Sequence, residues 1–169
     1  MRWVAVAIGL QLLSGCKSRP ADVTGAPVRA VAPPTAEAVP GVTMHELKPG
    51  SGELPALIAA EVNQARAQHL RPVVYVSATW CGPCNALKHS LGDPKMVDAF
   101  SGSYVIKLDL DAWDAPLKAA GFPVDSVPVF FQLDASGKPT GKNLTGAAWS
   151  DDVPANMAPP IKAFLAQAS

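Results

Sequence analysis

Residues 78–87 read ATWCGPCNAL, with two cysteines that are separated only by Gly82 and Pro83. Cysteines at this spacing occur in zinc sites, in structural disulfides, and in dithiols that open and close during a reaction. The preceding run, residues 72–77 (PVVYVS), is apolar and rich in β-branched side chains, which is typical of a buried strand. Asn85 to Leu91 then have a helical pattern. The sequence therefore places the cysteine pair at a strand–helix junction.

The rest of the sequence argues against two of the three possibilities for this pair. A structural zinc site needs four ligands, but the chain has one such pair and its three histidines show no ligand spacing. A disulfide that closes so short a loop removes little chain entropy and stabilises the fold little. We therefore predict a dithiol that cycles with its disulfide, with no bound metal and no other cofactor.

The two cysteines are expected to have different roles. Cys81 precedes the helix, where free N–H groups and the positive end of the helix dipole favour a thiolate, the attacking species in disulfide exchange. Pro83 suits the first helical turn, because a missing N–H costs nothing there. Cys84 lies one turn behind. We predict that Cys81 is an exposed nucleophile and that Cys84 is a shielded resolving thiol.

Trp80-Cys81-Gly82-Pro83-Cys84 resembles the active-site motif of the thioredoxin family, and the resemblance covers about residues 54–168. Within that family, the sequence is most similar to the branch that includes periplasmic disulfide-reducing domains. Val127-Pro128, which opens a predicted strand, matches a proline that the family carries there in cis.

The resemblance implies further site residues. A cis Pro128 would keep metal away from the dithiol, and the backbone of Val127 would bind an extended substrate peptide. Trp80 would shield the pair and form part of the docking surface. Two ordinary alternatives stay open here: Pro128 as a trans proline at a strand start, and Trp80 as a core aromatic.

The sequence departs from the family at Tyr75. Thioredoxins usually hold a buried Asp six residues before the first cysteine, where it helps the resolving cysteine lose its proton. Lys107 matches the lysine that accompanies this Asp. A phenol is a much poorer proton acceptor than a carboxylate at neutral pH. Either Cys84 resolves more slowly or through water, or Tyr75 simply fills the strand face.

The order of predicted elements indicates an α/β domain with a thioredoxin-like fold, in which helices flank a central mixed sheet on both faces. The expected helices cover residues 54–69, 85–91, 94–100, 115–120 and 154–168, and the expected strands cover 72–77, 104–110, 127–133 and 143–145.

The N-terminus has a different character. Met1-Arg2 is followed by an apolar run over residues 3–13, too short to span a bilayer. Residues 13–16 (LSGC) resemble the lipobox of bacterial lipoproteins. We predict a signal peptide over 1–15, a lipidated Cys16 with a Pro/Ala-rich tether over 16–52, and the thioredoxin-like domain over 53–169. The alternatives are a simple secretory signal and, for Val42 to Leu47, an edge strand packed on the domain.

These features predict a membrane-anchored thiol–disulfide oxidoreductase that reduces or exchanges disulfides of exported proteins. The 14 basic and 14 acidic residues balance, which gives no electrostatic reason to expect a nucleic-acid partner. We expect a monomer in the bacterial cell envelope, facing the periplasm and held in the membrane by lipid on Cys16. Lys17, where an inner-membrane lipoprotein would carry Asp, favours the outer membrane. The protein's expected partners are disulfide-containing exported proteins and an electron donor or acceptor. A non-catalytic binding or scaffold lipoprotein is the alternative.

Overall fold

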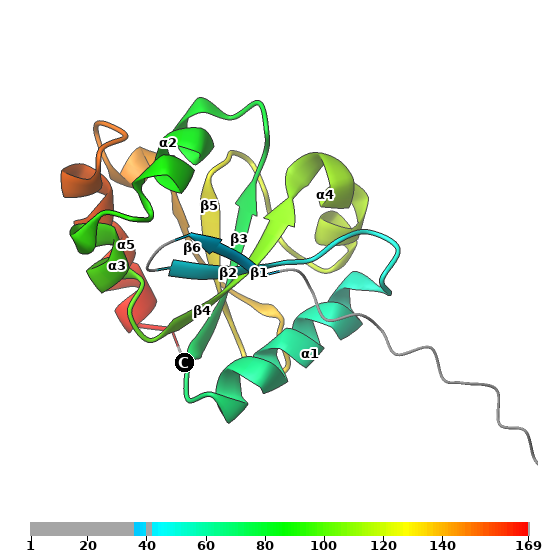
Figure 1. Ribbon diagram of the computed structural model, residues 1–169. Helices are drawn as coiled ribbons and strands as arrows, with labels where there is room; N and C mark the ends of the chain where they lie inside the picture. Colours follow the sequence, from blue (N-terminus) through cyan, green and yellow to red (C-terminus); the bar gives the residue numbers. More distant parts are fainter. Residues whose placement is uncertain (1–35, 40–41, 169) are drawn as a thin grey trace, which may run out of the picture. The chain divides into compact units, whose positions relative to one another are not determined.

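The computed structural model describes residues 36–39 and 42–168. Within this part, six strands form one mixed sheet in the order β1-β2-β4-β3-β5-β6 (Figure 1). The strands are β1 (Ala36–Val39), β2 (Val42–Glu46), β3 (Arg71–Ser77), β4 (Ser103–Asp109), β5 (Val129–Leu133) and β6 (Pro139–Thr145). The helices are α1 (Leu54–Ala67), α2 (Gly82–Ser90), α3 (Pro94–Ala99), α4 (Leu110–Ala119), α5 (Pro154–Ala166) and the short 3₁₀ turn η1 (Gly146–Ala148).

The middle of the sheet is parallel and both of its edges are antiparallel. β2, β4 and β3 run in the same direction, while β1, β5 and β6 each run opposite to a neighbour. Every residue of β5, and every residue of β3 after Arg71, is buried. Strands that are covered on both faces read as continuous apolar runs, which is why the sequence revealed them.

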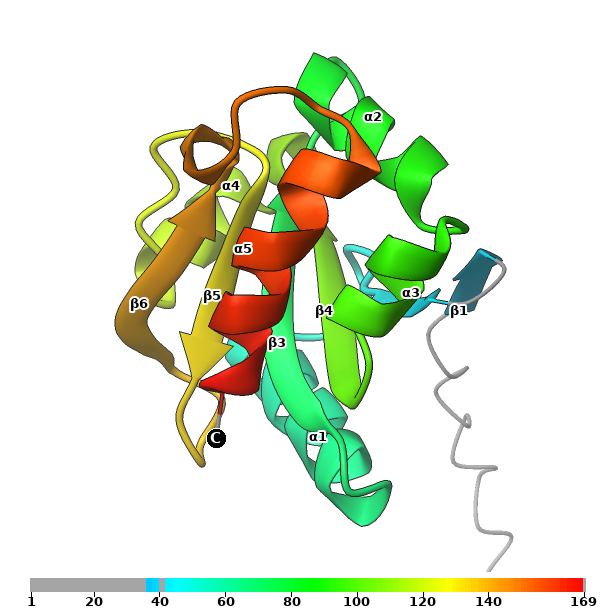
Figure 2. The ribbon, with the colours of Figure 1, turned by 90° about the vertical axis from the view of Figure 1, so that its left-hand side faces the viewer.

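Helices cover both faces, and each face has its own core. Helices α2, α3 and α5 pack on one face, and α1 and α4 pack on the other (Figure 2). The first core includes Tyr75, Leu87, Met96, Phe130 and Ile161; the second includes Ile58, Val74, Leu108, Trp113 and Phe131. The predicted arrangement, a central mixed sheet flanked by helices on both faces, is confirmed.

The predicted boundary between tether and domain at residues 52 and 53 is wrong. β2 lies between β1 and β4 and buries Val42 and Met44 in the first core. The alternative of a strand over residues 42–47 is therefore right, except that β1, and not β2, forms the edge. The predicted signal peptide, Cys16 and the first part of the tether lie outside the described residues.

α2 begins at Gly82, so Pro83 and Cys84 lie in its first turn, as predicted. Two other elements begin at least four residues earlier than predicted. α4 begins at Leu110, because the Asp109 carboxylate accepts the N–H of Ala112 at 3.2 Å and caps the helix directly after β4. β6 begins at Pro139; its side chains are mostly exposed, so no apolar pattern marked it. None of the described helices is long and apolar enough to cross a membrane.

Candidate active site

The sheet topology brings two distant segments together at the carboxyl ends of β3 and β4. These parallel strands end at the same edge of the sheet, and the cysteine motif follows β3. β5 runs antiparallel to β3, with Val129 opposite Val76, so the residues before β5 reach that same edge. Val127 and Pro128 therefore lie beside the cysteine pair although they are more than forty residues away in the sequence.

Cys81 and Cys84 form a disulfide with an S–S distance of 2.09 Å. Cys81 is the N-cap of α2, and its Sγ atom accepts the backbone N–H of Cys84 at 3.1 Å. An N–H that points at this sulfur, together with the positive end of the helix dipole, would stabilise a Cys81 thiolate after reduction. The geometry thus supports the attacking role that was predicted for Cys81.

The expected exposure of Cys81 is wrong for this disulfide form. Cys81 is 4% exposed and Cys84 is 3% exposed, so burial does not distinguish them. Ala78, Leu110 and Val127 pack around the pair. What distinguishes the two sulfurs is their surroundings, because Cys81 faces the Val127 backbone while Cys84 lines a cavity.

The segment before β5 has the conformation that the family resemblance implied. The Val127–Pro128 peptide bond is cis, as predicted. The carbonyl oxygen of Val127 lies 3.5 Å from Cys81 Sγ. The Pro128 carbonyl accepts the N–H of Gly146 at 3.1 Å, which ties this segment to the turn after β6. A Cβ atom on Gly146 would lie 3.2 Å from Pro128 Cδ, so this close approach favours glycine.

Trp80 is a surface residue, and the core alternative for it is wrong. Its side chain is 65% exposed beside the disulfide. The indole N–H donates to Asp111 Oδ2 at 2.9 Å, so the ring is held in place even though it is exposed. Sequence reasoning missed Asp111, because it placed the start of this helix after that residue. Gly82 and Pro83 form the first turn of α2 between the cysteines.

A row of side chains crosses the sheet beneath the cysteines. The strand register pairs Glu46 with Lys107, Lys107 with Tyr75, and Tyr75 with Phe130. Residues that are directly opposite on neighbouring strands have side chains in contact range on the same face. Lys107 Nζ lies 3.0 Å from Glu46 Oε2, and Lys48 also pairs with this carboxylate.

Tyr75 fills the strand face, which was one of the two interpretations of its position. The ring is 2% exposed and stacks on Phe130, with a centroid distance of 4.7 Å. Burial raises the pKa of the phenol above its usual value, although a hydrogen bond with the Ser77 side chain lowers it. Tyr75 therefore stays protonated at neutral pH and is not a proton acceptor.

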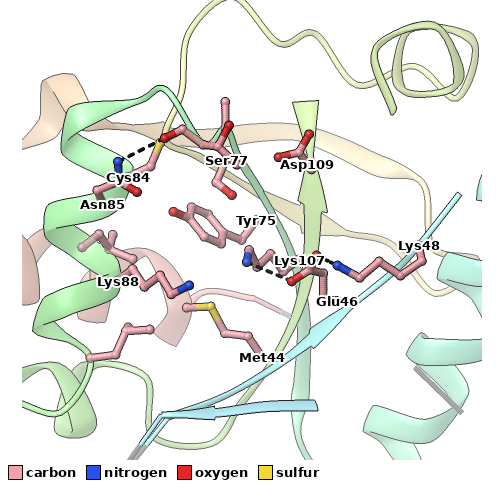
Figure 3. Close-up of a pocket in the computed structure, with 14 residues that line it drawn as sticks. Met44, Glu46, Lys48, Tyr75, Ser77, Cys84, Asn85, Lys88, Lys107 and Asp109 are labelled. Carbon is pink, nitrogen blue, oxygen red and sulfur yellow. Dashed lines mark hydrogen bonds and ion pairs between the residues drawn. The ribbon is translucent and has the colours of Figure 1, made fainter. Parts of the chain in front are cut away.

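A carboxylate nevertheless lies in this region, and sequence reasoning missed it. Glu46 comes from β2, inside the segment that was predicted as a tether. It lines a cavity of about 220 Å³ together with Cys84, Tyr75 and Lys107 (Figure 3). Figure 3 shows Lys48 and Lys107 both directed at the Glu46 carboxylate. Among the described residues, no group of three or more His, Cys, Asp or Glu side chains is placed to hold a metal ion.

Comparisons with known proteins agree with this geometry. No family model matches the chain. Over 87 residues it is 29% identical to the mitochondrial thioredoxin O of Oryza sativa subsp. japonica; the match covers 50% of this chain and 49% of that protein. The chain thus spans about half the length of this relative. The crystal structure of a disulphide isomerase from Xylella fastidiosa Temecula1 superposes with a TM-score of 0.52 and 20% identity, covering 72% of this chain and 96% of that one.

The fold and site define a class: an α/β domain with a disulfide at the N-terminus of a helix and a cis proline beside it. More specifically, the chain contains a domain with a thioredoxin-like fold.

Proposed function

We propose that this protein is a thiol–disulfide oxidoreductase that reduces or exchanges disulfides of exported proteins. The observation that carries the proposal is the Cys84 N–H that donates to Cys81 Sγ at 3.1 Å within a disulfide at the start of α2. This arrangement favours a thiolate at Cys81 and keeps Cys84 close enough to attack Cys81 and complete the exchange.

The reaction has two steps. In the reduced protein, the Cys81 thiolate attacks one sulfur of a substrate disulfide, and the other substrate sulfur leaves as a thiolate. Cys84 then loses its proton and attacks Cys81 Sγ, which breaks the mixed disulfide and releases the second substrate thiolate. The substrate gains two electrons and two protons, and the protein ends with the Cys81–Cys84 disulfide that the structure shows.

Substrate binding would use the surface around Cys81. An extended peptide could pair with the backbone at Val127, which lies beside Cys81 Sγ and next to the cis Pro128. The exposed indole of Trp80, which directly precedes Cys81 in the sequence, would supply apolar contact area.

Insulin reduction with dithiothreitol as electron donor tests this function. Wild type should accelerate precipitation of the insulin B chain, and Cys81→Ser should abolish the acceleration. Cys84→Ser should accumulate a mixed disulfide with its substrates, which mass spectrometry would identify. Equal rates for wild type and Cys81→Ser would contradict the proposal and favour a binding or scaffold role.

We further propose that the domain is anchored in the bacterial cell envelope by lipid on Cys16, facing the periplasm as a monomer. The support is the LSGC sequence at residues 13–16 after a short apolar run. Several acyl chains on one residue would give stable anchoring. Labelled palmitate should appear in wild type and disappear in Cys16→Ala; label that persists in the variant would refute the anchor.

A further inference from the structure

Completion of the exchange requires a base for Cys84. An ordinary cysteine has a pKa of about 8.5, so its thiol carries a proton at neutral pH. Cys84 is 3% exposed in the disulfide form, which limits direct proton transfer to bulk water. Tyr75, at the position where the related family carries a carboxylate, is a buried phenol and stays protonated. A basic group that lines the same cavity as Cys84 can take this proton instead.

The cavity next to Cys84 contains a charged carboxylate. Burial tends to raise the pKa of Glu46, but hydrogen bonds from Lys48 and Lys107 and the charges of both lysines bring it below its usual value. Glu46 is therefore ionised at neutral pH and can accept a proton. Lys48 follows β2, and Lys107 lies opposite Glu46 on β4.

Three further titratable side chains face the cavity besides the two lysines. Asp109, at the end of β4, uses Oδ1 to accept the Ala112 N–H and cap α4. Lys88 from α2 is a cation, and Tyr75 from β3 is neutral. The cavity of about 220 Å³ is polar and large enough for several water molecules, each of which occupies about 30 Å³. Cys84 and Glu46 both line this cavity, so water in it could carry a proton from one to the other.

We propose that Glu46 is the proton acceptor for Cys84, acting through water in this cavity, so that a carboxylate on β2 serves the resolving step. The proton of the Cys84 thiol passes through water to the Glu46 carboxylate as Cys84 sulfur bonds to Cys81 Sγ. The bond between Cys81 and the substrate sulfur breaks, and that sulfur leaves with the electron pair. Glu46 then returns its proton to solvent or to the leaving thiolate. This inference rests on the proposed oxidoreductase function.

Stopped-flow kinetics with excess 5,5′-dithiobis(2-nitrobenzoate) separate the two steps in the reduced, full-length protein. The first release of thionitrobenzoate reports attack by Cys81, and the second reports resolution by Cys84. In Glu46→Gln, the second phase should slow by about tenfold or more at pH 7, while the first changes by less than about twofold. Near pH 9 the thiol ionises by itself, so the difference from wild type should shrink. A purely structural defect would slow the second phase at every pH.

Glu61→Gln is the matched control. Glu61 is also a buried glutamate with a hydrogen-bond partner, Tyr104, but it belongs to α1 on the other face of the sheet. Both phases of this variant should match wild type at every pH. Slowing of the second phase equal to that in Glu46→Gln would overturn the specific role of Glu46.

The wild-type pH profile tests the proposal even if Glu46→Gln does not fold. With Glu46 as base, the second phase should vary little between about pH 5 and 8, because the carboxylate is already ionised there. A rise of about tenfold per pH unit over this range would show that only pre-ionised Cys84 reacts and would overturn the proposal. Absence of a second phase in wild type would refute the oxidoreductase function itself, whereas a normal second phase in Glu46→Gln would refute only the role of Glu46.

Discussion

At the scale of single residues, Tyr75 serves the packing of the core. Its ring packs on Phe130 in the core, and its hydroxyl bonds to Ser77. Tyr75→Phe should therefore keep both kinetic phases within about twofold of wild type. The lost hydrogen bond should lower the free energy of unfolding by about 1 kcal/mol, measured by urea denaturation. A selectively slow second phase would mean that the phenol takes part in proton transfer.

Asp111 provides the second test at this scale, because it holds the exposed Trp80 ring beside the disulfide. Asp111→Ala should raise KM for insulin about two- to tenfold, which corresponds to one lost hydrogen bond. The value of kcat should be nearly unchanged, because the cysteines are untouched. Asp114→Ala on the same helix is the control; its carboxylate pairs with Lys118, and its KM should equal that of wild type. A fall in kcat with constant KM in Asp111→Ala would contradict a docking role.

The sequence predicted the site residues that belong to a short local motif or that match a position in a known family. Cys81 and Cys84 were found from the motif, and Pro128 was found from its resemblance to a known family. Glu46 and Asp111 were missed because their roles depend on which strand lies beside which. Glu46 reaches the site only through the pairing of β2 with β4, and no local pattern encodes that pairing.

At the scale of elements, β2 contributes both to the core and to the site. Val42 and Met44 are buried on the same face as the Glu46 side chain. Met44→Ala should lower the free energy of unfolding by about 2–5 kcal/mol, because a buried side chain is replaced by a cavity. Urea denaturation would measure the loss. Thr43→Ala, at an exposed position of the same strand, should change it by less than about 0.5 kcal/mol. Similar losses for both variants would argue against the packing of β2.

The elements differed in how well the sequence revealed them. β3, β4 and β5 are buried runs rich in Val, Ile and Phe, and these predict strands directly. β2 is a short alternating stretch flanked by Pro- and Gly-rich residues, so composition favoured a tether. α4 was predicted too short because its first residues, Leu110 and Asp111, also continue the pattern of the preceding strand.

At the scale of the whole domain, the two cysteines face different surroundings. Cys81 Sγ lies against Val127 and near the exposed Trp80, where a substrate would bind. Cys84 lines the polar cavity that contains Glu46. The substrate would therefore meet Cys81, whereas the resolving proton would leave Cys84 through the cavity.

The opposite face of the sheet carries a titratable cluster that should influence stability. The His45 ring stacks on Tyr104 with a centroid distance of 3.9 Å, and its Nδ1 lies 4.0 Å from Glu61 Oε2. Burial lowers the pKa of His45, and the attraction of Glu61 only partly offsets this. The folded state therefore prefers neutral His45.

The sign of the resulting pH effect follows from this lowered pKa. Below the unfolded pKa of about 6.5, the unfolded chain binds a proton at His45 more readily than the folded chain, so stability falls as the pH falls through this window towards the lower folded value. His45→Phe keeps a ring on Tyr104 but cannot titrate. Urea denaturation from pH 7.5 to 5 should show that wild type loses stability relative to this variant as the pH decreases. His89→Asn, which replaces an exposed histidine, should follow the wild-type slope. Parallel curves for wild type and His45→Phe would show that His45 does not couple protonation to folding.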